Sequence, residues 1–466
     1  MSLQFIIGRS GSGKTQAIYE NLMEESMADQ AQKFFFIVPE QYTLQTQKDV
    51  VERHPHHGTM NIDIVSFPRL AYRVFEELSY FPEAVLEDMG KRMVLRRILE
   101  EQKDNLKIFG SSIHKQGFIE NMKSMISELY QYQVTPEMLA KVREGESGNL
   151  NYKLSDLMFI QTEFERFLEG NAIVAEQILE ILTEKIIKSE KIKDSIIYID
   201  GFTGFTPIQN QLIGRLLKLA KKVVISITAD FWIEDRKFVR EYELFSLSSA
   251  AVYKIKELAK EADIEILPTI RKQEIWRYQG RNKEDLSALE QGIFRYPVKP
   301  YEKKTENITL FAARDRLLEV RTICEKIAYY VREKGYRYRD IAIIAGDMEA
   351  YSAHFEQCFL ELKIPFFIDH KKSILNNPCV ETIRGLIKIA EENFSYQSVF
   401  RYLKAGMSDL STDQIDRLEN YALARGIQSK KRWTGVFVTP LKGQTEEELK
   451  ELNESRELFL SEVMEF

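Results

Sequence analysis

Gly8-Arg-Ser-Gly-Ser-Gly-Lys-Thr15 is the stretch of sequence that decides the fold of this chain. It fits the pattern G-x-x-x-x-G-K-[ST], in which glycines let backbone N–H groups turn inward around the α- and β-phosphates of a nucleotide. An apolar run, Leu3 to Ile7, precedes the octapeptide, and a helical stretch follows from Gln16. Because this is the strand-loop-helix context that the pattern requires, we expect an N-terminal P-loop NTPase-type α/β domain.

Every residue of the octapeptide is a predicted nucleotide contact. Lys14 is expected to reach the β- and γ-phosphates, and the Thr15 hydroxyl is expected to bind the Mg²⁺ that accompanies the nucleotide. ATP is the default nucleotide, and two alternatives stay open: a glycine-rich turn without a ligand, or a nucleotide with a purely structural role. The predicted nucleotide-binding residues are Gly8, Arg9, Ser10, Gly11, Ser12, Gly13, Lys14 and Thr15.

Composition limits the class of protein. The chain has 466 residues, 44% of them hydrophobic, so it can bury a large core divided among several domains. Its net charge is -6, and any contact with DNA must therefore be local rather than part of a global basic field. Three widely spaced cysteines, Cys324, Cys358 and Cys379, argue against a disulfide framework or a zinc site and favour a reducing, cytoplasmic location. No signal peptide or membrane span is predicted, and no membrane partner.

Short apolar runs predict a parallel sheet in the first half of the chain. Residues 34–38, 62–65, 196–200 and 223–228 read as strands, with helical stretches between them. From 82 to 190 helical spacing replaces the strand pattern. We therefore predict a first α/β domain from residues 1–81 and 191–300, interrupted by a helical insertion at 82–190.

The second half is expected to begin another α/β domain. A polar stretch with Pro297 and Pro300 reads as a linker, and apolar runs at 308–312 and 341–344 read as strands. Residues 301–376 would start a second α/β domain, and 377–466 would be helical. The chain ends on helical spacing without a stop signal, so we expect it to be truncated.

Asp200 is the candidate partner of the P-loop. It ends the run Ile-Tyr-Ile-Asp-Gly-Phe, where a carboxylate contacts Mg²⁺ in P-loop enzymes. Active helicases follow this Asp with a Glu that positions the attacking water, whereas this chain has Gly201. The alternative for Asp200 is a residue that merely ends a strand at a turn.

Four further motifs resemble those of a known family. Val65-Ser-Phe-Pro-Arg-Leu-Ala-Tyr-Arg-Val-Phe75 resembles the motif Ib region of UvrD-like superfamily 1 helicases, and 341–347 through 363–369 resemble their motif IV region. A narrower resemblance, to the AddB subunits of bacterial AddAB helicase-nucleases, rests on the P-loop together with three motifs. These motifs are Val38-Pro-Glu-Gln-Tyr-Thr43, Ile199-Asp-Gly-Phe-Thr-Gly-Phe-Thr-Pro207 and Ile364-Pro-Phe-Phe-Ile-Asp369. The resemblance covers essentially the whole chain.

The resemblance implies a helicase architecture and a role in DNA-break processing. It implies an α/β fold of two RecA-like domains with a helical insertion, and a heterodimer with an AddA-type subunit that acts on DNA ends for homologous recombination. The family's nuclease domain and its iron-sulfur cluster cannot be placed in these residues. Gly346 stands where active relatives offer an arginine to the γ-phosphate, so the motor would be degenerate, with weak or lost ATPase activity.

The resemblance also implies a channel for single-stranded DNA in which this subunit scans for the hotspot Chi. Aromatic side chains can stack bases there, and Gln, Thr and Arg can contact base edges or phosphates. Phe67 and Phe202 have a core position as their alternative. An active superfamily 1 translocase is the alternative function, and a small-molecule P-loop kinase would predict neither the insertion nor the second domain. The predicted DNA-binding residues are Gln41, Thr43, Phe67, Arg69, Tyr72, Phe202 and Phe205.

Overall fold

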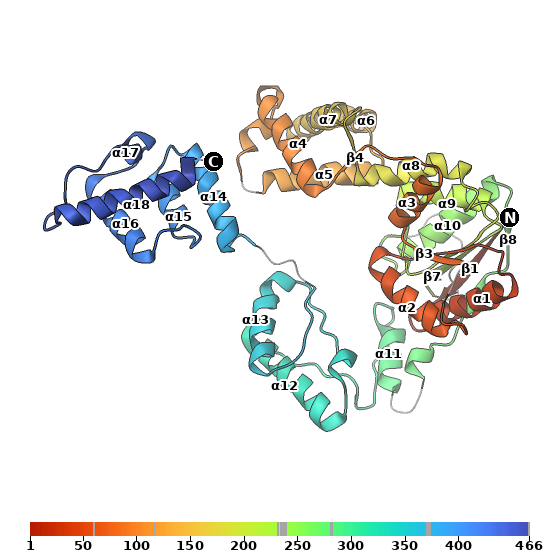
Figure 1. Cartoon of the computed structure of the whole chain (residues 1–466). Helices are drawn as coiled ribbons and strands as arrows, with labels where there is room; N and C mark the ends of the chain where they lie inside the picture. Colours follow the sequence, from red (N-terminus) through yellow and green to blue (C-terminus); the bar gives the residue numbers. More distant parts are fainter. Residues whose placement is uncertain are drawn as a thin grey trace. The chain divides into compact units, whose positions relative to one another are not determined.

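The chain forms two compact units in a computed structural model: Met1–Thr309 and Leu310–Phe466 (Figure 1). The structure describes residues 1–58, 61–115, 117–230, 233, 240–279, 283–369 and 374–464, so the last two residues of the predicted C-terminal helix lie outside the described residues. None of the helices in these ranges combines the length and apolar character needed to cross a membrane.

A parallel sheet is the centre of the first unit. In the described residues its strands run in the order β3-β2-β6-β7-β1-β8, and β9 also pairs with β1. All residues of β2 and β6 are buried, as expected for central strands covered on both faces. The mixed α/β class predicted from the sequence is confirmed. The strands are β1 (Ser2–Gly8), β2 (Phe34–Ile37), β3 (Ile62–Val65), β6 (Ile196–Ile199), β7 (Lys222–Thr228), β8 (Glu265–Ile266) and β9 (Ile270–Lys272).

Helices cover both faces of this sheet. On one face, α1 (Lys14–Ala28) and α2 (Thr43–Arg53) pack against alternate side chains of the strands, among them Phe36 and Tyr198. On the other face lie α3 (Phe67–Glu77), α8 (Ile178–Lys185), α9 (Pro207–Leu219) and α10 (Ser246–Glu261). The carboxyl ends of the strands meet at one edge of a parallel sheet, so the residues that follow β1, β6 and β7 are brought together.

The predicted helical insertion follows the sheet's third strand and contains α4 (Asp88–Glu101), α5 (Phe118–Gln131), α6 (Pro136–Glu144) and α7 (Asn149–Leu168). These helices share one core that includes Leu95, Ile126 and Phe164. Two strands that the sequence did not reveal, β4 (Ala84–Leu86) and β5 (Ala172–Val174), pair in parallel where the chain enters and leaves the insertion.

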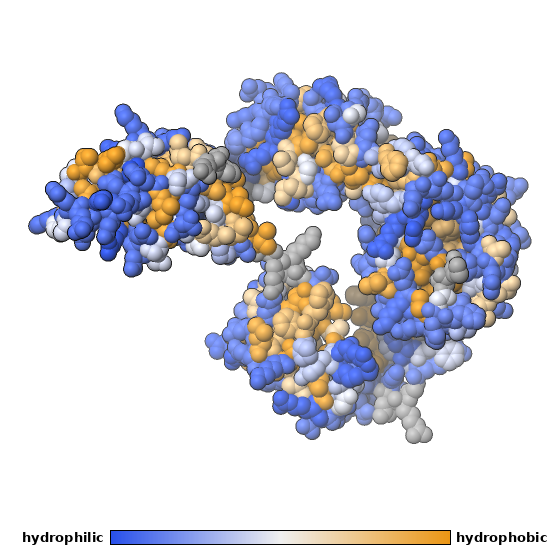
Figure 2. All heavy atoms as spheres, in the orientation of Figure 1, coloured by the Kyte–Doolittle hydropathy of each residue, from blue (hydrophilic) through white to orange (hydrophobic). Residues whose placement is uncertain are grey.

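The second unit contains a pair of helices followed by a helical cluster. α12 (Arg316–Lys334) and α13 (Met348–Glu361) bury Cys324 and Cys358 between them. Further along lie α14 (Pro378–Glu391), α15 (Tyr396–Leu403), α16 (Thr412–Arg425), α17 (Lys430–Thr434) and α18 (Glu446–Met464), and most of these helices pack around the fully buried Trp433. Figure 2 shows hydrophobic residues gathered at the surface around α12 and α13.

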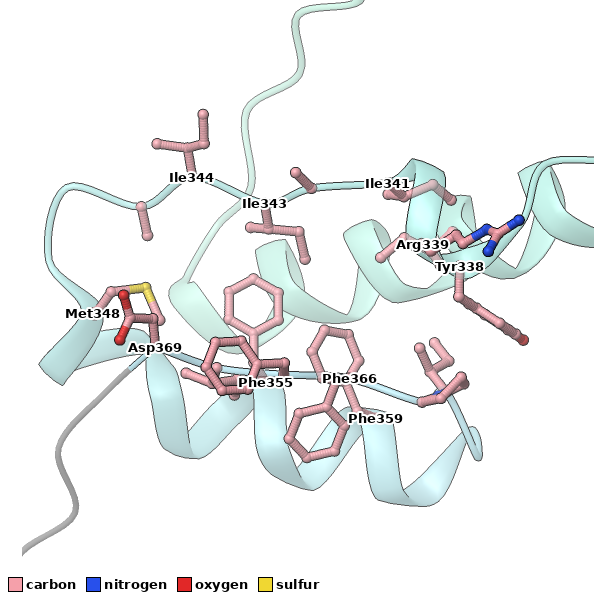
Figure 3. Close-up of a pocket in the computed structure, with 17 residues that line it drawn as sticks. Tyr338, Arg339, Ile341, Ile343, Ile344, Met348, Phe355, Phe359, Phe366 and Asp369 are labelled. Atoms are coloured by element: carbon pink, nitrogen blue, oxygen red, sulfur yellow. The ribbon is translucent and has the colours of Figure 1, made fainter. Parts of the chain in front are cut away.

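The strands predicted at 308–312 and 341–344 are wrong. Ile341 has extended backbone, but in the described part of the chain neither segment pairs with a neighbouring strand. A strand is stabilised by hydrogen bonds to its neighbour, and an apolar run alone does not supply them. The segment with Ile341 and Ile344 instead borders an apolar groove, opposite Phe366 and beside Phe355 of α13 (Figure 3).

Candidate nucleotide-binding site

The glycine loop joins the end of β1 to the start of α1. Gly11 and Gly13 have φ values of 79° and 83°, in the left-handed region that favours glycine. α1 begins at Lys14 directly after the loop, so the unpaired N–H groups of its first turn face the space that the loop encloses. A helix N-terminus of this kind favours anions, and phosphate above all.

Lys14 is the central cation of the loop. Its side chain is only 8% exposed, and its Nζ donates a 3.0 Å hydrogen bond to the carbonyl oxygen of Arg9. Burial lowers the pKa of Lys14 to about 8, against the opposing effect of Asp200 and with a further lowering by the Arg277 guanidinium. A buried ammonium group beside a second cation gains from a polyanionic ligand, since each charge is then neutralised.

Thr15 and Asp200 are in direct contact. The Thr15 hydroxyl donates a 2.7 Å hydrogen bond to Oδ2 of Asp200, and the Ser226 hydroxyl donates to Oδ1. Asp200 is 7% exposed and stands directly after β6, while Ser226 lies within the neighbouring β7. The two residues predicted to bind Mg²⁺ are therefore brought together at the sheet edge, with oxygen atoms of the kind that Mg²⁺ prefers.

Gly201 occupies a backbone conformation that other residues rarely adopt. Its φ is 84°, and a Cβ added there would lie 3.1 Å from Cδ of Pro39 and 4.0 Å from Cδ2 of Tyr42. An ordinary side chain would be strained at this position by its backbone and crowded by Pro39. In this conformation the position therefore favours glycine over Glu.

A turn that the sequence did not predict packs against the P-loop. β9 pairs with the end of β1, Gly8 opposite Lys272, and thereby carries the following residues across the loop. The Arg277 amide donates to the carbonyl oxygen of Gly11 at 3.2 Å, and its Nη1 donates to the Ser10 hydroxyl at 3.2 Å. Trp276 is 60% exposed, and its Cδ1 lies 3.5 Å from where a Cβ of Gly13 would be. A Trp-Arg pair after a strand was the available signal, but β9 is three residues long and was not recognised.

The Arg9 guanidinium forms ion pairs with carboxylates outside the glycine loop. Its Nε lies 2.7 Å from Asp230 and its Nη1 3.2 Å from Glu290, while Arg295 also pairs with Asp230 at 3.0 Å. All four side chains are at least three-quarters buried. In this arrangement Arg9 can offer a ligand its backbone, and its guanidinium is engaged elsewhere.

Three of the predicted DNA-binding residues lie along two adjoining surface depressions. Gln41 lines one of them, beside α2 and the edge strand β3, and Arg69 and Tyr72 of α3 line the other. The depressions share Gln47 and Ile64, and they combine amide, guanidinium and aromatic groups. The first is lined by Gln41, Leu44, Gln45, Gln47, Lys48, Val51, Ile62, Asp63 and Ile64, and the second by Gln47, Ile64, Val65, Arg69, Tyr72, Arg73 and Glu76.

The other predicted DNA-binding residues make contacts within the protein. Thr43 is 2% exposed, and its hydroxyl donates to the carbonyl oxygen of Glu40. Phe67 is also 2% exposed and packs on Phe202 and Phe205, with ring centroids 5.3 and 6.5 Å away. Thr43 and Phe67 are therefore not presented to a ligand in this structure, while Phe202 and Phe205 are half-buried. Phe67 therefore occupies a core position, which was the alternative to its predicted role in DNA binding.

Gly346 belongs to the second unit, just before α13. A Cβ added at this glycine meets no atom within 4 Å. Its predicted relationship to the γ-phosphate stays a prediction, because the glycine loop belongs to the other unit.

Comparisons with known proteins give a consistent result. A family model described as "ADDB, N-terminal" matches residues 5–290. The chain is similar to proteins named as the B subunits of ATP-dependent helicase/deoxyribonucleases from Lachnoclostridium phytofermentans, with 43% identity over 99% of this chain, and from Acetivibrio thermocellus, with 35% over 98%. A Clostridium novyi protein of the same name is 34% identical over 98% of this chain. The chain spans 41%, 40% and 40% of these three relatives, respectively.

Proposed function

Because this chain belongs to the AddB family, we propose that it forms the helicase-like part of an ATP-dependent helicase/deoxyribonuclease. The relatives are named as one of the subunits of such an enzyme, and we extend this role to the chain. Its proposed partner is an AddA-type helicase-nuclease subunit in a cytoplasmic heterodimer. The proposed substrate is a double-strand DNA end that is processed for homologous recombination.

We propose ATP with Mg²⁺ as the ligand of the glycine loop. The contact between Thr15 and Asp200 beside the buried Lys14 carries this proposal, since it joins a phosphate-binding cation to two Mg²⁺-binding oxygens. The Ser12 hydroxyl gives further support: it is buried and, within the described residues, has no hydrogen-bond partner. Lys14 and Arg277 would hold the phosphates, and Thr15 and Asp200 would hold the ion, which neutralises phosphate charge when bound.

The sequence Asn-Lys-Glu-Asp at 282–285 has the spacing of a guanine-reading motif. Asp285, its reading carboxylate, already accepts hydrogen bonds from the backbone N–H groups of Glu306 and Asn307 and from the Asn307 side chain. It is 5% exposed and has little capacity left for a base. ATP therefore remains the proposed nucleotide.

We propose that the motor is degenerate and that ATP is held with little turnover. Gly201 supports this view, because its backbone does not favour the Glu that would position water. One observation favours the alternative function, an active superfamily 1 translocase. Arg277 lies at the glycine loop, where its guanidinium donates to the Ser10 hydroxyl and would supply positive charge to a bound triphosphate.

We propose that the two adjoining depressions with Gln41, Arg69 and Tyr72 bind and scan single-stranded DNA for Chi. Tyr72 is 46% exposed and can stack a base, while the amide and guanidinium groups can contact base edges or phosphates. A Cβ added at Gly201 would lie 4.0 Å from Cδ2 of Tyr42, so the loop after Asp200 lies near the segment that carries Gln41. This proximity offers a route between nucleotide and DNA.

Two measurements test the proposal. Equilibrium binding of a fluorescent ATP analogue should be Mg²⁺-dependent and lost in Lys14→Ala, and retained affinity in that variant would refute the nucleotide site. ATPase activity with and without single-stranded DNA separates the two motor hypotheses. Strong DNA-stimulated turnover by this chain alone would favour the translocase.

A further inference from the structure

One short helix connects the glycine loop to the end of the first unit. α11 (Glu284–Gly292) carries two partly or fully buried carboxylates, Glu290 and Asp285. They lie five residues apart, about 7.5 Å along the helix at 1.5 Å per residue. Glu290 contacts the glycine loop, and Asp285 contacts the segment that leads to Leu310, where the second unit begins.

The contact with the loop runs through Arg9. Its guanidinium bonds Glu290 on α11 and Asp230, which follows β7. The carbonyl oxygen of the same residue accepts the hydrogen bond of Lys14. Arg9 is therefore bonded at its backbone to the phosphate-binding cation and at its side chain to α11.

The contact with the segment that leads to Leu310 is a set of hydrogen bonds to the Asp285 carboxylate, which we call the clasp. Its Oδ2 accepts from the N–H groups of Glu306 at 2.9 Å and Asn307 at 2.8 Å. Its Oδ1 accepts from Asn307 Nδ2 at 2.9 Å and from the N–H of Leu286 at 2.8 Å. These bonds, led by the backbone bond from Asn307, lower the pKa of Asp285 to about 2, so the clasp is fully charged at neutral pH.

We propose that nucleotide occupancy of the glycine loop is coupled, through Arg9, Glu290 and α11, to the ordering of Glu306 and Asn307. The coupling rests on the proposed function, because it requires that the loop binds a nucleoside triphosphate. Arg9 and Glu290 are positioning residues in this scheme, since the Arg9 guanidinium is bonded to Asp230 and Glu290.

The chemistry of Lys14 supplies the driving step. Its ammonium group is bonded to the Arg9 carbonyl, and a bound phosphate competes for those protons with a full negative charge. The Arg9 carbonyl oxygen then loses one hydrogen-bond partner while the Arg9 guanidinium stays bonded to Glu290. A change in the conformation or order of the loop is therefore transmitted to α11. By thermodynamic reciprocity, loosening the clasp changes nucleotide affinity by the same factor.

Hydrogen exchange tests this coupling on the whole chain. With a non-hydrolysable ATP analogue and Mg²⁺, the amides of Glu306 and Asn307 should exchange about fivefold more slowly in the wild type, the lower end of typical couplings. Glu290→Gln keeps the side-chain volume but removes the charge that links Arg9 to α11, while Asp230 still holds the guanidinium. In this variant the analogue should still protect the glycine loop while its effect on the two amides disappears.

Glu284→Gln is the matched control. It lies on the same helix but pairs with Lys303 in a largely exposed ion pair, which contributes little, so the slowing should persist. Asp285→Asn tests reciprocity: it should weaken analogue binding about fivefold without touching the nucleotide, and add nothing further when combined with Glu290→Gln.

The outcomes separate the two proposals. If the wild type does not bind the analogue, the proposed nucleotide site fails. If it binds and protects the glycine loop but leaves Glu306 and Asn307 unchanged, or if Glu290→Gln retains the slowing, the coupling is overturned while the nucleotide site stands. Circular dichroism of each variant verifies that it is folded.

Discussion

The Thr15 hydroxyl donates a 2.7 Å hydrogen bond to Asp200, although 185 positions separate the two residues in the sequence. The parallel sheet produces this contact, because β1 leads into the glycine loop, β6 ends before Asp200, and only β7 lies between them. The two groups predicted to bind Mg²⁺ are thus already together. An arriving ion would exchange their hydrogen bond for coordination.

Replacing Lys14 by Met should stabilise the nucleotide-free protein at pH 7. Burial lowers the pKa of Lys14 from 10.5 to about 8, so the folded state carries the cost of a desolvated ammonium group below pH 8. At about 1.4 kcal/mol per pKa unit, this cost is about 3 kcal/mol, and it is relieved as the pH rises from about 8 to 10.5. Thermal melts should show a stability gain at pH 7 that shrinks toward pH 10.5.

The exposed Lys33 provides the control for that experiment. Lys33→Met should leave the melting temperature unchanged at both pH values. Equal gains for Lys14→Met at pH 7 and pH 10.5 would contradict a desolvated lysine. Lys14→Met should also no longer bind ATP.

Arg277→Ala should weaken binding of ATP about tenfold, because it removes a guanidinium that can make charge-assisted bonds to phosphate, worth about 1.5–3 kcal/mol. Arg277→Lys should recover part of the affinity, since it restores the charge without the planar fork. Isothermal titration calorimetry with ATP and with tripolyphosphate measures both. Unchanged affinity in Arg277→Ala would place this residue outside the site.

Trp276 should report nucleotide binding by fluorescence. It lies against Gly13 and is 60% exposed, so a base or phosphate that enters the loop changes its surroundings. We expect ATP to change the emission of the wild type, and this change to vanish in Trp276→Phe. Trp433, fully buried in the second unit, should not contribute. A signal that persists in Trp276→Phe would contradict this prediction.

Gly201→Glu should destabilise the protein by about 1–2 kcal/mol, the cost of the left-handed conformation for an ordinary residue. It should also fail to create ATPase activity, because the strained backbone and Pro39 prevent the carboxylate from settling beside Asp200. Gly204→Ala serves as the comparison, since its Cβ would make an ordinary 3.9 Å contact with Leu247. Urea unfolding and phosphate release check both parts.

Arg69→Ala combined with Tyr72→Ala should weaken binding of single-stranded DNA. Loss of one stacked base costs about 1–3 kcal/mol, so the affinity should fall about tenfold or more. Fluorescence anisotropy with a labelled oligonucleotide measures this, with Arg166→Ala on the insertion as a control of equal charge. If DNA affinity and the Chi response of a reconstituted heterodimer are both unchanged, the depressions are not the DNA site.

The sequence predicted the parallel sheet because β2 and β6 are continuous apolar runs and β7 is largely apolar, and buried parallel strands have that composition. It missed β4, β5 and β9 because three-residue strands carry no periodic signal. It also assigned strands at 308–312 and 341–344, but neither forms a strand in the described residues, and the second segment borders an open apolar groove instead.

The residues of the candidate site were likewise predicted only in part. The P-loop and Asp200 are recognisable from local pattern, since each follows directly from a strand end. Arg277 was missed because its contact with Ser10 spans 267 positions and depends on the short β9. Thr43 and Phe67 were chosen for their chemistry, but hydrogen bonding and aromatic packing turn them inward.

The left-handed backbone of Gly201 also has an evolutionary consequence. A motor that had merely lost its Glu by one substitution could regain it by the reverse substitution. Here the reverse change meets an unfavourable φ and a crowded Pro39, so a second change in the loop would have to come first. In the proposed degenerate motor, such a loop would act against reversion, because a single substitution at Gly201 would not restore a well-placed Glu.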